Sequence, residues 1–288
     1  MRVSISVSDF TWPGGPAAMG AHLAALAGAA DAAGVHTLWL PDHLVQADPR
    51  KSPDAEMLET YTTLGFIAAR TERIRLGAMV TPVSYRSPSV VVKAATTLDV
   101  LSGGRAWFGI GAGYSEGEAR DMGLDFPPTA ERFERLTEAL EIAFRMWAGD
   151  TTPYEGTHYR LGKPLNSPNS LQRPHPPVLI GGSGERKTLR LVAQYADACN
   201  LGDMPDKGAT IRRKLAVLEE HCADVGRSFS DIDKTVSTVF IDGESPEAFA
   251  ERCGVLAGYG TEHVVLFHSW TLESLDALAK LIPAVADI

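Results

Sequence analysis

Short apolar runs alternate with longer amphipathic stretches from one end of the chain to the other. The short runs have the apolar content and length of buried β-strands. We predict eight of them, at Val3–Val7, Thr37–Leu40, Ile74–Val80, Ala106–Ile110, Val178–Ile180, Asp197–Leu201, Lys234–Ile241 and His263–Phe267.

The longer stretches repeat apolar residues at the spacing of an α-helix. In residues 130–147, Phe133, Leu136, Leu140 and Phe144 recur at spacings of three and four, with charged residues on the opposite face. The same pattern predicts eight helices, at Ala18–Ala33, Glu59–Arg70, Val90–Leu101, Ala130–Trp147, Arg186–Tyr195, Lys207–Val225, Pro246–Tyr259 and Leu272–Val285.

Strands that alternate with helices in this way favour parallel β/α units closed into a barrel. A doubly wound open sheet has the same alternation and stays open as the alternative. No internal repeat indicates a solenoid. We therefore predict one α/β domain over residues 1–288, a (β/α)8 TIM barrel.

One segment interrupts the alternation, between the fourth and fifth strands. Residues 149–177 are rich in Pro, Gly and Asn and show no strong strand or helix period. A connection of this length in a compact domain is typical of a lid or binding loop. A disordered surface insertion is the alternative, but Tyr154, Tyr159 and Leu161 provide apolar anchors and favour the lid.

Composition and charge exclude several classes of protein. The 288 residues are 44% hydrophobic and 22% charged, with a net charge of -9, so the chain has no basic footprint for nucleic acid or an anionic membrane. No apolar run approaches the roughly 20 residues that span a bilayer, and the N-terminus lacks a signal-peptide core. Three widely spaced cysteines fit reduced thiols in the cytoplasm better than disulfides or a zinc site.

In a (β/α)8 barrel the chemistry lies at the carboxyl ends of the strands. The side chains that follow the predicted strands are polar or aromatic, with glycines where a backbone must come close to something. They are Phe10 and Trp12 after the first strand, Asp42 and His43 after the second, Thr81 and Tyr85 after the third, Gly111, Gly113 and Tyr114 after the fourth, and Asn200 at the sixth.

His43 is the best acid/base candidate, because imidazole both takes and gives a proton near neutral pH. The spacing equally allows the Asp42–His43 pair only to stabilise a loop, and this alternative stays open. No pair of histidines has the spacing of zinc ligands, so we expect no metal site.

A second candidate is the loop in "VLIGGSGERK", residues 178–187, which lies between a strand and a helix. Neither this loop nor the glycines at 109, 111 and 113 completes the dinucleotide motif, and no P-loop follows. Bare amides at a helix N-terminus still bind phosphate. We therefore predict a phosphate site at Gly181, Gly182, Ser183 and Gly184, with a plain strand-to-helix turn as the alternative.

Taken together, these segments resemble the bacterial luciferase-like oxidoreductase family, whose members are (β/α)8 barrels that use FMN or the deazaflavin coenzyme F420. The resemblance covers nearly the whole chain. It is carried by "GVHTLWLPDHL" at 34–44, by residues 73–118 with "LGAMVTPVSYRSP" and "WFGIGAGYSEGE", by "RFERLTEALEIAFRMW" at 132–147 and by "PPVLIGGSGERKTLRLVAQYADACN" at 176–200.

The resemblance implies roles for the strand-end residues. The 181–184 loop would hold the cofactor phosphate, and His43 would face the ring with Asp42 beside it. A bulge, in this family often with a non-proline cis peptide, would back the ring, and residues 149–177 would cover the substrate side. The implied cofactor-binding residues are Met79, Val80, Thr81, Gly111, Gly113, Gly181, Gly182, Ser183, Gly184 and Asn200, and the implied substrate pocket is Phe10, Trp12, Trp39, Tyr85 and Tyr114.

Two departures from the family's sugar-phosphate dehydrogenases argue against that specific activity. Those enzymes carry a glutamate after the strand-four glycines, where this chain has Tyr114. They also carry a tryptophan shortly after the histidine, and "DHLVQAD" has none.

The resemblance favours an F420-dependent oxidoreductase that transfers hydride between the ring and a small organic substrate. Trp39 or Trp12 would wall the reacting face and His43 would move the matching proton. An FMN-dependent monooxygenase fed by a separate flavin reductase is the second hypothesis, and a non-catalytic flavin-binding protein is the third. Family members usually dimerise through the helices after the second and third strands, so we expect a homodimer.

Overall fold

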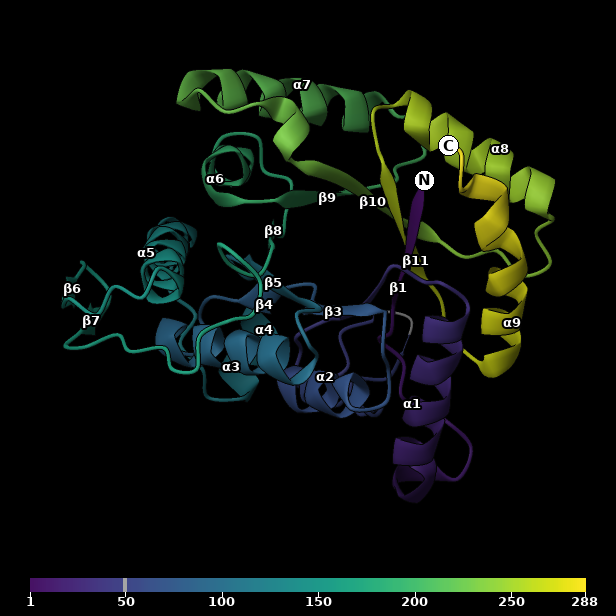
Figure 1. The fold of residues 1–288 in the computed structure, drawn as a ribbon, viewed down its shortest axis with the longest axis horizontal. Helices are drawn as coiled ribbons and strands as arrows, with labels where there is room; N and C mark the ends of the chain where they lie inside the picture. Colours follow the sequence, from purple (N-terminus) through teal and green to yellow (C-terminus); the bar gives the residue numbers. More distant parts are fainter. Residues whose placement is uncertain (49–50) are drawn as a thin grey trace.

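In the computed structural model, which describes residues 1–48 and 51–288, the strands form a closed barrel (Figure 1). The barrel strands are β1 (Arg2–Ser6), β2 (Thr37–Leu40), β3 (Arg75–Ala78), β4 (Thr81–Pro82), β5 (Ala106–Gly111), β8 (Val178–Ile180), β9 (Ala198–Gly202), β10 (Asp233–Val239) and β11 (His263–Phe267). The third position of the barrel is shared by two short strands, β3 and β4. The barrel strands are parallel, and the pairing of β3 with β5 closes the barrel. The predicted barrel is confirmed, and the open doubly wound sheet is wrong because no gap is left between strands.

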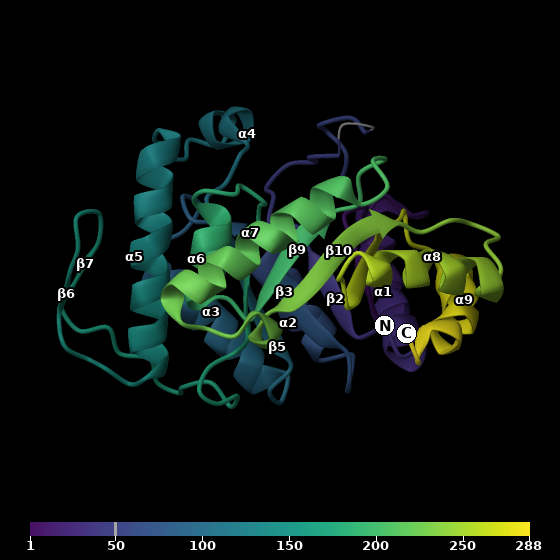
Figure 2. The ribbon, with the colours of Figure 1, turned by 90° about the horizontal axis from the view of Figure 1, so that it is seen from above.

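Helices surround the barrel in the positions that the apolar periodicity predicts. They are α1 (Gly15–Ala32), α2 (Thr60–Ala68), α3 (Pro88–Leu101), α5 (Thr129–Trp147), α6 (Thr188–Tyr195), α7 (Ala209–Val225), α8 (Pro246–Gly258) and α9 (Leu272–Leu281). A further short helix, α4 (Glu116–Asp121), follows β5 and lies at the top of Figure 2. It was not predicted, because "EGEARD" is too short and too polar to show a helical apolar period.

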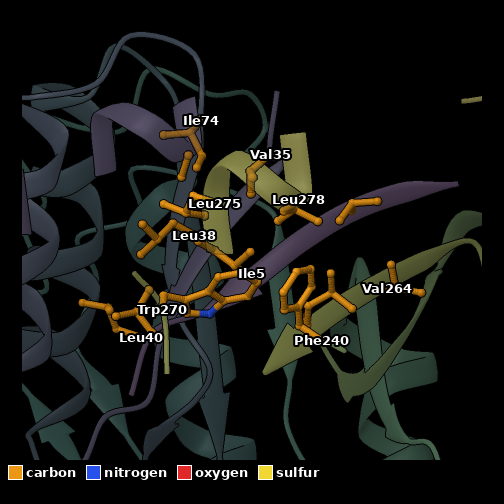
Figure 3. Packing of buried hydrophobic residues seen from close by; sticks show 14 of the residues in the cluster. Ile5, Val35, Leu38, Leu40, Ile74, Phe240, Val264, Trp270, Leu275 and Leu278 are labelled. Carbon is orange, nitrogen blue, oxygen red and sulfur yellow. The ribbon is translucent and has the colours of Figure 1, made fainter. Parts of the chain in front are cut away.

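The apolar core has three parts, two outside the barrel wall and one inside it. The first lies between β1, β2, β10 and β11 and helices α1, α8 and α9, where the Trp270 indole packs among Ile5, Leu38 and Leu275 (Figure 3). Its Nε1–H donates to the Ser6 carbonyl at 2.9 Å, so the buried indole has its hydrogen bond. The second packs α3, α5, α6 and α7 onto β5 and β8. The third, inside the barrel, is small and centres on two tryptophans.

The third barrel strand, predicted as the single strand Ile74–Val80, is interrupted and forms β3 and β4 instead. β3 ends at Ala78, the Met79–Val80 peptide is cis, and pairing resumes in β4, where Thr81 lies opposite Ile110 of β5. This confirms the expected bulge. The interruption places the Val80 side chain over the carboxyl ends of β5 and β8, where only glycine fits beneath it. A Cβ at Gly181 would lie 2.4 Å from Val80 Cγ2, and one at Gly111 would lie 2.9 Å from it.

Residues 149–177 are ordered structure on the outside of the barrel. β6 (Tyr154–Glu155) and β7 (Arg160–Leu161) form an antiparallel hairpin beyond α5, as Figures 1 and 2 both show. Glu138 of α5 accepts hydrogen bonds from the backbone amides of residues 157–159. The returning chain is held by Asp99, whose carboxylate accepts the Leu171 and Gln172 amides at 2.7 and 3.1 Å.

This placement corrects the lid prediction. Tyr154 is buried and its hydroxyl donates to Glu141 of α5 at 2.7 Å, so the apolar anchor attaches the segment to the flank of the barrel. The described residues that line the cavity at the carboxyl ends of the strands include none from 149–177. The alternative of a disordered insertion is also wrong, because the segment is hydrogen-bonded along its length.

Candidate functional site

A cavity of about 540 Å³ opens at the carboxyl ends of the strands, and we call it the mouth cavity. A hollow of about 970 Å³ lies outside the barrel along α2 and α3, but two lysines are the only charged residues among the described residues that line it. The mouth cavity is therefore the better candidate. It is lined by Pro41, His43, Met79, Val80, Pro82, Tyr85, Gly111, Ala112, Gly113, Tyr114, Ser115, Thr129, Arg132, Phe133, Gly181, Gly182, Ser183, Gly184, Thr188, Asn200, Ser237 and Phe267.

One end of the mouth cavity is the glycine loop between β8 and α6. Within the described residues, no acceptor takes the backbone N–H of Gly182, Ser183 or Gly184. Gly182 has φ +97°, a left-handed conformation that favours glycine. Lys214 of α7 donates to the Ser183 carbonyl at 2.6 Å and places its ammonium beside the loop, 3.7 Å from Glu185. Free amides just before a helix, beside a lysine, fit a phosphate group.

The other end of the mouth cavity holds His43, whose two ring nitrogens both have partners. Nδ1 lies 2.6 Å from Glu118 Oε2, and the other oxygen of Glu118 accepts the Leu44 amide at 2.6 Å. Nε2 lies 3.0 Å from the hydroxyl of Tyr114. Glu118 is thus a site residue that the sequence reasoning missed. It lies on α4, the helix without a periodic signal.

Electrostatics define the roles of the two ring nitrogens. Burial raises the pKa of Glu118, but hydrogen bonds from His43 and the Leu44 amide outweigh it and lower that pKa to about 2. Glu118 is therefore ionised at neutral pH and only accepts hydrogen bonds, so His43 Nδ1 carries the hydrogen. In the neutral imidazole, Nε2 then carries the lone pair and faces the cavity. Desolvation of the phenol group and the Glu118 charge raise the pKa of Tyr114, so its hydroxyl is protonated and can donate to Nε2 of the neutral ring.

Tyr85 and Arg132 complete the polar wall. Burial, and after it the neighbouring Glu118 carboxylate, raises the pKa of Tyr85 and keeps its buried hydroxyl protonated. Arg132 of α5 donates to the carbonyls of Ala112 at 3.1 Å and Pro127 at 2.6 Å, which fixes the chain between β5 and α5. None of the described carboxylates pairs with Arg132, so the cavity wall keeps its positive charge.

The structure changes the expectation for Asp42. Its carboxylate is buried behind the cavity wall, where Arg86 binds it through two N–H groups at 2.6 and 3.0 Å. Thr81 donates to the same carboxylate at 2.7 Å. Neither Asp42 nor Thr81 lines the mouth cavity. The pair joins the loop that carries His43 to the chain after the cis peptide, which is a positioning role.

Three of the five aromatic residues expected in the substrate pocket lie elsewhere. Trp39 is fully buried inside the barrel, 5.5 Å from Trp107 between ring centroids, beneath the cavity floor formed by Met79, Val80 and Phe267. Phe10 belongs to the outer core and Trp12 packs on it edge-on. These predictions are wrong because a residue's place after or within a strand does not show at which depth of the barrel its side chain lies.

The remaining predicted residues do meet in the mouth cavity. They are His43, Met79, Val80, Tyr85, Gly111, Gly113, Tyr114, Gly181, Gly182, Ser183, Gly184 and Asn200. Two missed lining residues, Ser237 and Phe267, lie toward the carboxyl ends of β10 and β11, and reading those strand ends would have found them. Arg132 and Phe133 lie in the first turn of α5, and no strand-end signal points to them.

Residues 1–48 and 51–288 contain no cluster of three or more histidine, cysteine or acidic side chains able to bind a metal ion. None of the helices in this part of the chain is long and apolar enough to cross a membrane.

Comparisons with known proteins place this geometry in a family. The family model described as luciferase-like monooxygenase matches residues 1–282. F420-dependent glucose-6-phosphate dehydrogenases from Kineococcus radiotolerans and Microbacterium testaceum are 31% and 32% identical, over 80% and 71% of this chain. The chain spans 66% and 59% of the length of those two proteins, less than two-thirds of each.

Solved structures show the same fold at low identity. An F420-dependent secondary alcohol dehydrogenase in complex with an F420-acetone adduct has a TM-score of 0.82 at 17% identity, with full coverage of both chains. A monooxygenase from Streptomyces bottropensis has a TM-score of 0.81 at 18% identity and covers 99% of this chain, which covers 98% of it. The match of the family model over almost the whole sequence is decisive: the chain belongs to the luciferase-like monooxygenase family.

Proposed function

We propose that this protein is an oxidoreductase that uses coenzyme F420 and transfers hydride between the deazaflavin and a small organic substrate. The observation that carries the proposal is a single cavity that joins the free amides of the glycine loop to an oriented histidine. The relatives described as F420-dependent dehydrogenases support the same cofactor.

The cofactor, when bound, supplies the ring atom that accepts or releases hydride, and the protein supplies position and proton transfer. In this proposal the amides of residues 182–184 hold the phosphate, and Met79 and Val80 back the ring. His43 Nε2 takes the proton of a substrate hydroxyl during oxidation and returns it during reduction. Glu118 stabilises the imidazolium that forms, because its carboxylate stays charged beside Nδ1.

Tyr114 has a part in the same proposal. Its hydroxyl holds the position on His43 Nε2 that a substrate hydroxyl needs, while 77% of the side chain is exposed. It follows Gly113, which has φ +78°, on the loop before α4. Tyr114 therefore moves aside when substrate binds, and it connects His43 to solvent when the substrate has left.

A groove next to the mouth cavity favours F420 over FMN. Arg186, Lys187 and Arg190 line this groove of about 350 Å³ between α5 and α6, and Phe133 borders both spaces. Glu134 is the one acidic side chain among the described residues that line it. F420 continues beyond its phosphate into an acidic tail, whereas FMN ends at the phosphate, so a basic groove beyond the glycine loop has a partner only in F420.

Titration of the purified protein with F420 and with FMN, followed by fluorescence quenching, tests the cofactor. We expect saturable binding of F420 that is tighter than that of FMN. Micromolar binding of FMN with no binding of F420 would overturn the proposal and point to a monooxygenase supplied by a separate flavin reductase. Binding of F420 with turnover that survives His43→Ala would instead indicate a protein that binds the cofactor without using this histidine.

We also propose a homodimer formed through α2 and α3. The outer hollow along these helices has exposed apolar side chains at its edge, with Val90 55%, Leu101 69% and Leu165 59% exposed. Such clustering is typical of an interface. Sedimentation of the wild type should give a dimer, and Leu101→Lys should shift it toward monomer. A wild-type monomer at micromolar concentration would contradict the proposal.

We propose a cytoplasmic location because of the state of the cysteines. Cys199, Cys222 and Cys253 are buried free thiols, and burial raises the pKa of Cys199 to about 12. Buried thiols of this kind suit a reducing compartment. Fractionation of cells that express the protein is the test, and recovery outside the cytoplasmic fraction would contradict it.

A further inference from the structure

The amino ends of the strands enclose a second hollow of about 500 Å³, at the end of the barrel opposite the mouth cavity. We call it the lower bowl. Its charged and aromatic lining comes from distant segments of the chain, with Arg2 at the start of β1, Arg75 in β3 and Trp107 in β5. The inserted segment adds Arg173 and His175, and His36 precedes β2.

Two arginines of the lower bowl have no carboxylate partner within 4 Å in the described part of the chain. Arg75 donates to Gln172 Oε1 at 2.8 Å and lies over the Trp107 ring at 5.3 Å. Arg173 donates only to backbone carbonyls, those of Ser170 and Gln172. Asp197 is the acid that lines the bowl with them. A positive bowl is unexpected in a protein with a net charge of -9.

Donors also outnumber acceptors in the wall of the bowl. Arg75 Nε and Trp107 Nε1 are buried and have no hydrogen-bond partner within the described residues. An unsatisfied buried donor destabilises the folded state, and a nearby anion offsets part of that cost. Burial lowers the pKa of His36 to about 4, and the positive charges of His263, Arg2 and Arg75 act in the same direction, against the opposing charge of Asp233.

We propose that the lower bowl binds a phosphate group, held by the guanidinium groups of Arg75 and Arg173. A planar guanidinium presents N–H groups in a fork that matches phosphate oxygens, and two unpaired forks at one hollow suit a dianion. The bowl has more space than inorganic phosphate fills, so it also admits a small phosphate monoester. This site is separate from the mouth cavity and does not depend on the reaction there.

Histidine NMR separates the two ends of the barrel, because each end has its own reporter. Protein with labelled histidine rings is titrated with inorganic phosphate at constant ionic strength, with chloride as the control anion. We expect saturable shifts of His36 and His175, and any binding of phosphate at the glycine loop to move His43 instead. No saturable shift of His36 or His175 would overturn the proposal.

A matched pair of variants tests the residues. Arg173→Gln removes an exposed guanidinium of the bowl, whereas Arg160→Gln removes an arginine on the same inserted segment that pairs with Glu155 outside it. We expect Arg173→Gln to weaken phosphate binding about tenfold, from the loss of one charge-assisted contact, and Arg160→Gln to leave it unchanged. Equal affinity in the two variants would overturn the proposal.

A second probe identifies the source of the phosphate group. Glycerol phosphate is titrated beside inorganic phosphate, with the same histidine reporters. Tighter binding of the monoester would assign the bowl to phosphorylated metabolites, and tighter binding of inorganic phosphate would assign it to the free ion. Failure of both probes would contradict the proposal, while the F420 titration would remain unaffected by either result.

Discussion

The two ends of this barrel present positive potential by different means. At the mouth cavity the donors are backbone amides of residues 182–184, supported by Lys214 from the neighbouring helix. At the lower bowl the donors are side chains, above all Arg75 and Arg173. The mouth also contains a polar triad of Glu118, His43 and Tyr114 that can move a proton, and the bowl has no matching arrangement among its described lining residues.

This difference separates the residues that we expect to take part in the reaction from those that we expect to affect the stability of the fold. Backbone amides do not titrate, so the phosphate site that we propose at the mouth needs no charged side chain to donate its hydrogen bonds, while the oriented imidazole of His43 is free to carry protons. The bowl depends on charges that interact with one another, as the low pKa of His36 shows. Reaction is therefore expected at the mouth, and ligand-dependent stability at the bowl.

The largest expected effect is on the reaction itself. His43→Ala should lower kcat about 10²–10⁴-fold, because a positioned acid/base contributes that much, with F420 affinity nearly unchanged. His175→Ala, at the opposite end of the barrel, is the matched control and should retain wild-type kcat. Equal activity of the two variants would remove His43 from the mechanism.

Next in size is the buried ion pair behind the mouth. Asp42→Ala should lower the free energy of unfolding by about 1–3 kcal/mol, since it removes the buried acceptor of two Arg86 N–H groups and the Thr81 hydroxyl and leaves Arg86 with only the half-exposed Glu59 as its partner. Glu155→Ala breaks an exposed pair with Arg160 at 3.6 Å on the outer hairpin and should cost less than about 1 kcal/mol. Chemical denaturation measures both, and similar losses would show that Asp42 does not anchor the His43 loop.

Glu118→Gln should have a smaller effect on catalysis. Loss of the partner that orients an active imidazole costs about 10–100-fold, here expected in kcat and with an altered pH–rate profile. A change confined to KM would contradict a positioning role.

Protein stability gives an independent test of the Glu118 charge. Its pKa falls from 4.5 to about 2 in the folded protein, so its contribution is complete above pH 4.5. That contribution is lost as the pH falls toward 2, because the folded carboxylate is then protonated as well. The stability difference between wild type and Glu118→Gln should therefore shrink over this range, and a constant difference would contradict the assignment.

The smallest expected effect concerns the bowl. The pKa of His36 falls from 6.5 to about 4 on folding, so between these pH values the unfolded chain binds a proton at His36 and the folded protein does not. Stability should therefore decline as the pH drops from 6.5 toward 4, and His36→Asn should flatten this part of the profile. Phosphate should flatten it too by opposing the positive charge. A slope that His36→Asn leaves unchanged would assign the decline to other groups.

Local patterns predicted most of the fold and half of the site. The alternation of strands and helices was confirmed because each apolar run is buried where it forms. The glycine loop and His43 were found because a cluster of glycines, or a histidine after a strand, is visible in a few neighbouring residues. Glu118 was not found, because its partnership with His43 joins residues 75 positions apart.

The sequence by itself determined the barrel, its helices and the glycine loop with its free amides at residues 182–184, since these depend on apolar periodicity and backbone freedom. Tertiary structure alone decided which side chains share a space. It buried Trp39 inside the barrel, turned Asp42 away from the cavity and attached residues 149–177 to the flank of the barrel. It also gathered two unpaired arginines at the lower bowl. Closure of the barrel brings distant strand ends together, and no local pattern records which of their side chains then meet.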